Sequence, residues 1–563
     1  MSLRSSTLAF IGAIAMFLVQ PPADLWMLAW LAPLPWLWIV QRDALDGRRP
    51  WMVLWAAGFL HWLLAIHWLR LPHPATSIGW VALSAYLAAY LPLFIWVARR
   101  LVHRRGWPLE LAAPIAWMGC EQLRGWVLGG FTFAALGHTQ WRWTMLLQAA
   151  DLCGAVGVGG IVMAVAAGIA ALLARPRSPI AYGAWRAATV VVGLPAIALA
   201  YGAWRLAEEP RSTRRPLDIL LVQGSIDTEL KHDPAAAEQV ARHYDELTVR
   251  ALTASGPRPD LVVWPETMWR WGLLEIDPAE TLPESVVAEA AGSEQAEPDD
   301  QRQARARRVL EAERLATVGA FARRYATRWL VGLDRQVITP RAAGGAEHYN
   351  SALFLAADGD AIGRYDKMYP VMFGEYVPFA DRFPWLYRLT PLPAGLTAGR
   401  TCLAVTIEGL RVAPTICYET ALPEAVRSIV LDLEAAGGRP DVLVNLTNDG
   451  WFWGSSELDM HLAAGIFRAV EVRTPLVIAA NTGFSAWIDG SGRLLARGPR
   501  RNTGTIRAKV EPDGRRSPWL AWGSVPTGLC VAVVAAAALE TVAERKARRS
   551  RSGDALTGLP MQG

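Results

Sequence analysis

Cysteine is scarce in this chain, and no two of its five cysteines are spaced as CxxC. Such usage is typical neither of a disulfide framework nor of a zinc site. Net charge is also small, because 56 basic and 51 acidic residues leave a formal charge of +5. The basic residues fall in short clusters between apolar segments, so the sequence does not predict nucleic-acid binding.

Apolar residues are abundant instead. They make up 52% of the chain, and the 27 tryptophans are unusual, since tryptophan favours membrane interfaces. A segment of about 20 apolar residues crosses a bilayer. We expect about eight transmembrane helices, at residues 7–22, 24–41, 51–70, 77–98, 107–123, 153–174, 186–206 and 519–539.

These segments and the composition between them predict the domain organisation. We expect a helical membrane domain with about seven spans at residues 1–207 and a charged, proline-bearing linker at 208–216. An outer domain follows at 217–512, the last span lies within 513–543, and a basic tail occupies 544–563.

Basic residues orient the predicted spans. They gather in alternate connections and in the tail, while the opposite connections hold few. By the positive-inside rule both termini are cytoplasmic, and residues 217–512 lie on the periplasmic side of a bacterial inner membrane. The orienting residues are Arg42, Arg48, Arg49, Arg99, Arg100, Arg104, Arg105, Arg175, Arg177, Arg186, Arg545, Lys546, Arg548, Arg549 and Arg551.

In residues 411–420, RVAPTICYET, an apolar run is followed directly by the reactive side chain of Cys417. The pattern predicts a buried strand that delivers Cys417 to a sharp turn, the position that a nucleophile needs. The alternative is that Cys417 is a small core residue, since free cysteine is among the most buried types.

Residues 261–267, LVVWPET, predict a second strand end. Proline does not continue a central strand, so we expect the strand to end at Pro265 and Glu266 to stand at the edge or mouth of the sheet. Taken alone, Glu266 would be a solvated acid.

Residues 363–379, GRYDKMYPVMFGEYVPF, contain Lys367 and Glu375. Lys367 taken alone would be a surface base. Together, Glu266, Lys367 and Cys417 supply a base, a cation and a thiol in an order that resembles the Glu–Lys–Cys triad of the nitrilase superfamily.

Three more motifs extend this resemblance: LVQGS at 221–225, NLTNDGWFWG at 445–454 and NTGFSAWID at 481–489. Strands alternate with helices between them, which favours an α/β sandwich with catalytic residues at strand ends. The resemblance implies a nitrilase-like αββα sandwich, here inserted into a multi-span α-helical membrane domain.

A nitrilase-like domain placed before the last membrane span is similar to the apolipoprotein N-acyltransferase family. Glu121 and Arg124, three apart at a helix end, and the stretch 136–140 also resemble that family's membrane part, although a purely structural connection is the alternative. The resemblance implies transfer of an acyl chain from a phospholipid, typically phosphatidylethanolamine, to the α-amine of a lipoprotein's diacylglyceryl-cysteine.

The resemblance also implies roles for the residues. Cys417 is expected to form a thioester, Glu266 to move protons, and Lys367 to stabilise the oxyanion. The backbone N–H of Tyr418 is expected as a second oxyanion donor. No metal and no organic cofactor is needed.

Supporting roles follow for three neighbours. Glu375 is expected beside Lys367, and the alternative is that it pairs only with surface cations. Tyr418 and Glu419 match supporting positions of the family, with a purely structural role as the alternative. Four tryptophans are candidates for a lipid-facing rim, with ordinary packing as the alternative for each: Trp269, Trp271, Trp385 and Trp453.

The sequence departs from the family's pattern in three places. The usual Phe-Pro-Trp reads Phe131-Thr132-Phe133, a frequent tryptophan is replaced by His232, and Pro-Phe-Gly-Glu begins with Met372. They affect expected contacts with lipid or acceptor and leave the triad positions intact.

Two other functions fit parts of the sequence. A membrane-anchored amidase would use the same triad with water as the acceptor, but it needs only one anchor. A scaffold or transporter-like protein would need no triad.

Overall fold

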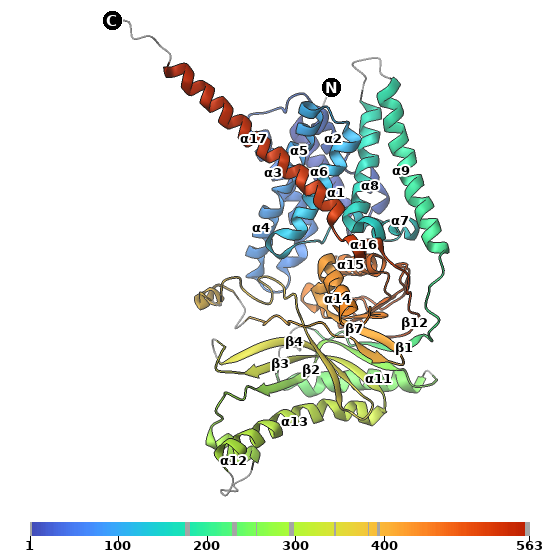
Figure 1. Cartoon of the computed structure of the whole chain (residues 1–563), viewed down its shortest axis with the longest axis vertical. Coiled ribbons are helices and arrows are strands. Elements are labelled where there is room, and N and C mark those ends of the chain that lie inside the picture. Colours follow the sequence, from blue (N-terminus) through green and yellow to red (C-terminus); the bar gives the residue numbers. More distant parts are fainter. Residues whose placement is uncertain are drawn as a thin grey trace. The chain divides into compact units, whose positions relative to one another are not determined.

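The computed structural model describes residues 3–174, 181–227, 234–254, 256–291, 298–342, 345–380, 382–390 and 395–557. The chain divides into two compact units (Figure 1). Unit 1 comprises Met1–Ile66, Val81–Arg205 and Trp522–Gly563, and unit 2 comprises His67–Trp80 and Leu206–Ala521. His67–Trp80 therefore belongs with the long central part of the chain, although no sequence pattern indicates this. His232 and the predicted connection 175–180 lie outside the described residues.

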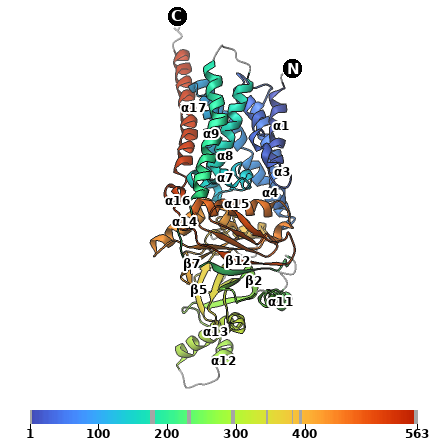
Figure 2. The same cartoon turned by 90° about the vertical axis from the view of Figure 1, so that its right-hand side faces the viewer.

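Helices make up unit 1, and several run side by side in Figure 2. Their shared core consists almost entirely of Ala, Leu, Ile, Val, Trp and Phe side chains, as expected where a helix is apolar on all sides. The helices are α1 (Ser5–Leu18), η1 (Trp26–Trp30), α2 (Leu34–Gln41), α3 (Pro50–Ala65), α4 (Thr76–Leu87), α5 (Tyr90–Arg105), α6 (Leu109–Trp126), η3 (Val127–Gly129), η4 (Gly137–Gln140), α7 (Thr144–Leu147), α8 (Ala150–Leu173), α9 (Ala181–Ala207) and α17 (Val525–Thr557).

Among the described residues, four helices are long and apolar enough to cross a membrane: Thr76–Arg105, Ala150–Leu173, Gly183–Ala207 and Val525–Lys546. The multi-span prediction is therefore confirmed only in this coarser form, and eight spans are not. Helices α1 and α3 are apolar but shorter. The segment 24–41 forms two short helices, η1 and α2, because Pro33 and Pro35 interrupt the apolar run.

Glu121 and Arg124 stabilise the loop that follows α6. Glu121 accepts a hydrogen bond from the Leu136 N–H at 3.0 Å, and Arg124 donates to the carbonyls of Phe131 and Phe133 at 2.8 and 2.7 Å. The two side chains lie 3.6 Å apart. A buried ion pair thus satisfies backbone groups that lipid could not.

Two six-stranded sheets form the centre of unit 2. The first has the order β12-β1-β2-β3-β4-β5, and the second has the order β11-β10-β9-β8-β7-β6. The strands are β1 (Leu217–Gln223), β2 (Leu261–Ile276), β3 (Arg328–Ile338), β4 (Ala346–Leu355), β5 (Ala361–Asp366), β6 (Val405–Ile407), β7 (Leu410–Ile416), β8 (Val442–Thr447), β9 (Leu476–Ala480), β10 (Ala486–Ile488), β11 (Leu494–Arg497) and β12 (Gly504–Val510).

The sheets pack face to face through a core of aliphatic side chains from both, among them Ile219 on β1, Val412 on β7 and Val444 on β8. Figures 1 and 2 show α11 and α13 over one outer face, and α14 and α15 over the other. The predicted αββα sandwich is confirmed. Its helices are η5 (Pro234–Ala236), α11 (Ala237–Ala254), α12 (Glu284–Ala291), α13 (Asp299–Tyr325), η6 (Pro384–Leu389), η7 (Cys417–Ala421), α14 (Pro423–Ala435), η8 (Asp449–Phe452), α15 (Glu457–Val472) and α16 (Pro518–Trp522), with η2 (His67–Arg70).

Candidate active site

Cys417 stands directly after β7, at the first position of η7. Its φ angle of +51° lies in the left-handed region, which is uncommon for a non-glycine residue. Two side chains bind its carbonyl oxygen: Asn445 on β8 and His461 on α15 donate to it, each at 3.2 Å. The predicted strand and sharp turn are therefore present, and the Cys417 residue is half-buried as a whole, with its thiol on the buried side.

Glu266 lies in a wide bulge of β2. The prediction that the strand ends at Pro265 is wrong, since β2 continues to Ile276 and is central in its sheet. Its pairing with β3 breaks instead, so that residues 265–268 face Gly332 alone. Proline is tolerated there because the ladder needs no donor at a bulge.

Close backbone approach makes the bulge possible. A Cβ atom at Gly332 would lie 2.4 Å from the Pro265 carbonyl oxygen and 2.6 Å from the Glu266 Cα. Thr267 completes the bulge with a φ of +53°. A left-handed β-branched residue is a true outlier, and such strain persists where the surrounding structure over-determines it.

Two asparagines hold the Glu266 carboxylate. Asn350 Nδ2 donates to Oε1 at 2.6 Å, and the Asn448 backbone N–H donates to Oε2 at 2.8 Å. The Glu266 side chain is only 6% exposed, so it is not a solvated acid. Asn481 donates to Asn448 Oδ1 at 2.9 Å, which joins the motifs at 445–454 and 481–489 beside Glu266.

Lys367 is buried rather than on the surface, with 1% of its area exposed. Its Nζ lies 2.6 Å from Glu375 Oε1 and 3.8 Å from Glu266 Oε1. Glu375 also accepts the Val371 N–H through Oε2 at 2.7 Å. Glu375 thus pairs with a buried cation and orients it, rather than pairing only with surface cations.

The charges of Glu266 and Lys367 shift the pKa of the Cys417 thiol in opposite directions. Burial raises its pKa well above the usual range, the Glu266 carboxylate raises the pKa further, and the Lys367 ammonium lowers it. Burial alone would lower the pKa of Lys367, but Glu375, Cys417 and Glu266 outweigh it and raise that pKa. The structure therefore brings a protonated amine, a carboxylate and a largely un-ionised thiol together.

Glu419 connects two segments of the site. Its Oε1 accepts the Tyr365 hydroxyl at 2.8 Å and the Met368 N–H at 2.7 Å, while its Oε2 accepts the Ile416 N–H at 2.7 Å. These bonds fix the residues beside Lys367 against the end of β7. Tyr418, which lies between Cys417 and Glu419, is half-buried.

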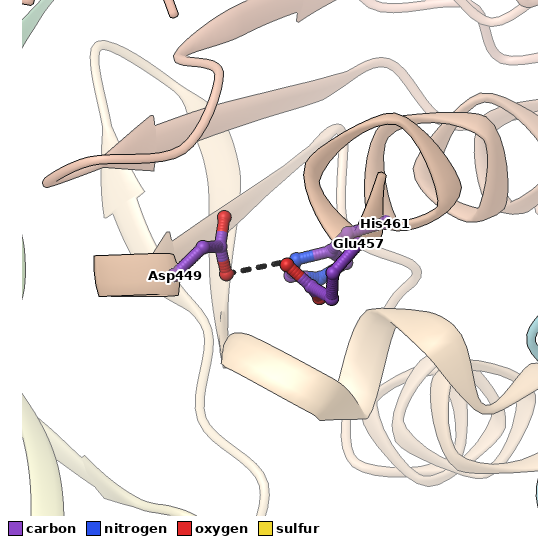
Figure 3. Close-up of side chains that lie close together, drawn as sticks. All are labelled: Asp449, Glu457 and His461. Atoms are coloured by element: carbon purple, nitrogen blue, oxygen red, sulfur yellow. Dashed lines mark hydrogen bonds and ion pairs between the residues drawn. The ribbon is translucent and has the colours of Figure 1, made fainter. Parts of the chain in front are cut away.

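A buried cluster lies behind Cys417, where Asp449, Glu457 and His461 meet (Figure 3). Their ligand atoms all lie within 4.8 Å of one another, close enough to surround a cation. His461 Nδ1 lies 3.2 Å from Asp449 Oδ1. Burial opposes the charged form of His461, yet Asp449 and the Cys417 carbonyl outweigh it and raise its pKa.

Sequence reasoning missed Asn350, Asn445, Asn448 and His461. Asn445 and Asn448 lie within a motif noted for its resemblance, but no pattern marks Asn350 or His461. Of the tryptophans named as candidates for a lipid-facing rim, Trp269 packs in the core against Phe321, so the alternative of ordinary packing holds for this residue. Two of the others, Trp385 and Trp453, are each about half exposed, at 56% and 47%.

Comparison with known proteins places this geometry in a family. The model of the apolipoprotein N-acyltransferase N-terminal domain matches residues 12–168, and the carbon-nitrogen hydrolase model matches residues 221–517. The apolipoprotein N-acyltransferase of Geobacter metallireducens is 30% identical over 556 residues, which cover 95% of each chain. The chain belongs to the apolipoprotein N-acyltransferase family.

Another relative covers a similar share. The apolipoprotein N-acyltransferase of Rhodopirellula baltica is 29% identical over 544 residues, 92% of this chain and 93% of the relative. Among solved structures, an amidase of Nesterenkonia sp. AN1 is 16% identical, with a TM-score of 0.34 over 55% of this chain and 94% of the amidase. A carbon-nitrogen hydrolase of Xanthomonas campestris is 20% identical, with a TM-score of 0.33 over 56% of this chain and 96% of its own.

Proposed function

We propose that the chain transfers an acyl chain from a membrane phospholipid to the N-terminal α-amine of the diacylglyceryl-cysteine of apolipoproteins. The observation that carries the proposal is the buried contact of Lys367 with Glu266 beside Cys417, in a chain with helices long enough to span a membrane. Family membership supplies the class of reaction. The donor is phosphatidylethanolamine, and the product is a triacylated lipoprotein.

In the first half-reaction, Glu266 accepts the proton of the Cys417 thiol. The thiolate sulfur then forms a bond to the ester carbonyl carbon of the phospholipid. Lys367 and the Tyr418 N–H stabilise the tetrahedral oxyanion. The bond to the glycerol oxygen breaks, Glu266 returns its proton to that oxygen, and a lysophospholipid leaves.

In the second half-reaction, the free amine of the acceptor attacks the Cys417 thioester. Glu266 takes the amine proton, an amide bond forms, and the carbon–sulfur bond breaks. The sulfur recovers a proton from Glu266. Because the first product leaves before the acceptor arrives, the kinetics are ping-pong.

The predicted topology suits these substrates. Both are lipids that remain in the bilayer, so the proposal places the catalytic domain, residues 217–512, on the periplasmic side of the inner membrane. The membrane domain at 1–207 and the last span within 513–543 then lie in the bilayer, and both termini are cytoplasmic. The basic clusters Arg99–Arg100 and Arg104–Arg105 support this orientation.

Mass spectrometry of the enzyme with phospholipid alone tests the proposal. We expect one acyl chain on Cys417 and one equivalent of lysophospholipid, and hydroxylamine should discharge the thioester. A diacylated lipopeptide with a free α-amine should then yield a triacylated product. Cys417→Ala should not load, whereas Cys402→Ala should load normally.

Three outcomes would contradict the proposal. Discharge into water at the same rate without lipopeptide would indicate an amidase or esterase rather than a transferase. Loading of a residue other than Cys417, or full transfer by Cys417→Ala, would remove the thioester from the mechanism.

A further inference from the structure

Two side chains bind the carbonyl oxygen of the peptide bond between Cys417 and Tyr418. Its carbonyl oxygen accepts one hydrogen bond from Asn445 Nδ2 and one from His461 Nε2, both at 3.2 Å. A trans peptide is planar, with its C=O and N–H pointing in opposite directions. Fixing the carbonyl therefore also fixes the direction of the Tyr418 N–H, which the mechanism uses as an oxyanion donor.

His461 contacts an acceptor through each ring nitrogen. Nε2 faces the Cys417 carbonyl, and Nδ1 faces Asp449 Oδ1, which already accepts the Thr447 hydroxyl at 2.8 Å. A neutral imidazole has one donor nitrogen and one acceptor nitrogen, so it can satisfy only one of these contacts. Both are satisfied when the ring carries two protons and Asp449 is ionised.

The surroundings favour this charge state. His461, Asp449 and Glu457 are each 3% exposed, so water does not replace either hydrogen bond. Figure 3 shows the Glu457 carboxylate beside the ring. Burial and the Asp449 charge raise the pKa of Glu457 well above its usual value, which favours the neutral form of Glu457 beside the ring.

We propose that His461, held by Asp449, is a positioning residue that orients and polarises the Cys417–Tyr418 peptide so that the Tyr418 N–H stabilises the oxyanion. A charge-assisted hydrogen bond to the carbonyl strengthens the dipole of the same peptide unit. The inference rests on the proposed function, since it assigns part of the oxyanion site of that reaction.

Two reactions of Cys417 separate this role from a structural one. Acylation by phospholipid passes through a tetrahedral oxyanion, whereas alkylation by iodoacetamide displaces iodide and forms no oxyanion. We expect His461→Leu to slow acyl-enzyme formation by about 100-fold, the usual cost of one oxyanion donor, with kcat reduced and KM little changed. Its alkylation rate should stay at the wild-type value.

Matched variants sharpen the test. His461→Gln retains an N–H donor that can reach the Cys417 carbonyl, so it should regain part of the acylation rate. His243 also contacts a backbone carbonyl within unit 2, that of Gly224 at 2.9 Å, and stands on another helix. His243→Leu should load and alkylate as the wild type does.

Three outcomes would overturn the inference. Wild-type loading by His461→Leu would show that the residue does not matter for the oxyanion. Equal loss of acylation and alkylation in His461→Leu would show that His461 has only a structural role. Loss of loading in EDTA, regained with Zn²⁺ or Mn²⁺, would place a cation rather than a proton between His461 and Asp449. Failure of the wild-type enzyme to load would instead contradict the proposed function.

Discussion

At the scale of single residues, Lys367 has the most constrained setting in the site. It is buried between two carboxylates, with Glu375 at hydrogen-bond distance and Glu266 further away. A buried ammonium costs much solvation energy, which these partners offset. The shorter distance pairs Lys367 with Glu375, which agrees with the proposed role of Glu266 in proton transfer.

We predict that Lys367→Arg and Lys367→Met both lose acyl transfer by about 100-fold or more. Arginine keeps the charge, but its wider planar head does not fit a site shaped around a compact ammonium. Acyl-enzyme formation measures the effect, and an unchanged unfolding temperature in detergent serves as the control. Near-normal turnover by the arginine variant would contradict the role in the oxyanion site.

The raised pKa of Cys417 predicts a distinctive pH dependence. Because the thiol keeps its proton to high pH, its alkylation rate should still rise at pH 9, where an ordinary cysteine levels off. Glu266→Gln removes the carboxylate that raises this pKa, so its alkylation curve should move to lower pH. The same variant should load phospholipid more slowly, because it has lost the base.

Easier alkylation together with slower acyl loading in Glu266→Gln would distinguish a general base from a residue without a role in proton transfer. Rates of iodoacetamide alkylation and of acyl loading are compared across pH 6–10 by mass spectrometry. Slower alkylation together with slower loading would indicate general damage to the site. Faster loading would show that Glu266 does not accept the proton.

At the scale of elements, the bulge in β2 positions the proposed base. It turns residues 265–268 away from β3, and Gly332 leaves the space that the displaced backbone needs. Glu266 is then held by residues from two other strands, Asn350 on β4 and Asn448 after β8. The base is thus positioned from both sheets.

Gly332→Ala should therefore displace Glu266 while leaving its carboxylate chemically unchanged. The added Cβ would overlap the backbone of the bulge, and a displacement of about 1 Å at a reacting group costs about 100-fold in rate. Acyl loading is the measurement. Gly79→Ala is the matched control, because a Cβ there meets nothing within 4 Å, and it should load normally. Equal loading by both variants would show that the bulge tolerates the methyl group.

Local pattern predicted the strands that lead to Glu266 and Cys417 and the sharp turn at Cys417, because apolar periodicity and proline act over a few neighbouring residues. It missed the continuation of β2 beyond Pro265, since a bulge depends on the partner strand. It also missed Asn350 and His461, whose contacts span 84 and 44 residues. Pairings over such distances arise from topology, which no local pattern encodes.

At the scale of the whole molecule, hydropathy predicted the division into apolar helices and an α/β unit, but not each helix. Residues 24–41 are apolar enough to cross a membrane, yet Pro33 and Pro35 shorten the helix to α2. Helix α6 falls outside the helices classed as spans, and it contains Glu110, Glu121 and Arg124. The last two of these charges, near its end, satisfy the following loop, a role that composition alone does not reveal.

Orientation of the whole chain is open to direct measurement. Glu289 is an exposed residue of α12, and Arg104 is an exposed residue at the end of α5. In a background with Cys402 and Cys417 replaced by alanine, we expect Glu289→Cys to react with an impermeant maleimide from the periplasm. Arg104→Cys should react only after the cells are broken. The reverse pattern would invert the topology.

The grouping of Lys367 with Glu266, Glu375 and Cys417 also predicts how the reaction rate depends on ionic strength. Passing a proton from the thiol to Glu266 moves charge within the group but leaves the net charge of the four side chains unchanged. Mobile ions respond mainly to net charge, and they screen buried groups weakly. The chemical step should therefore be nearly independent of added salt, so that any salt dependence of turnover reports the arrival of the lipid substrates.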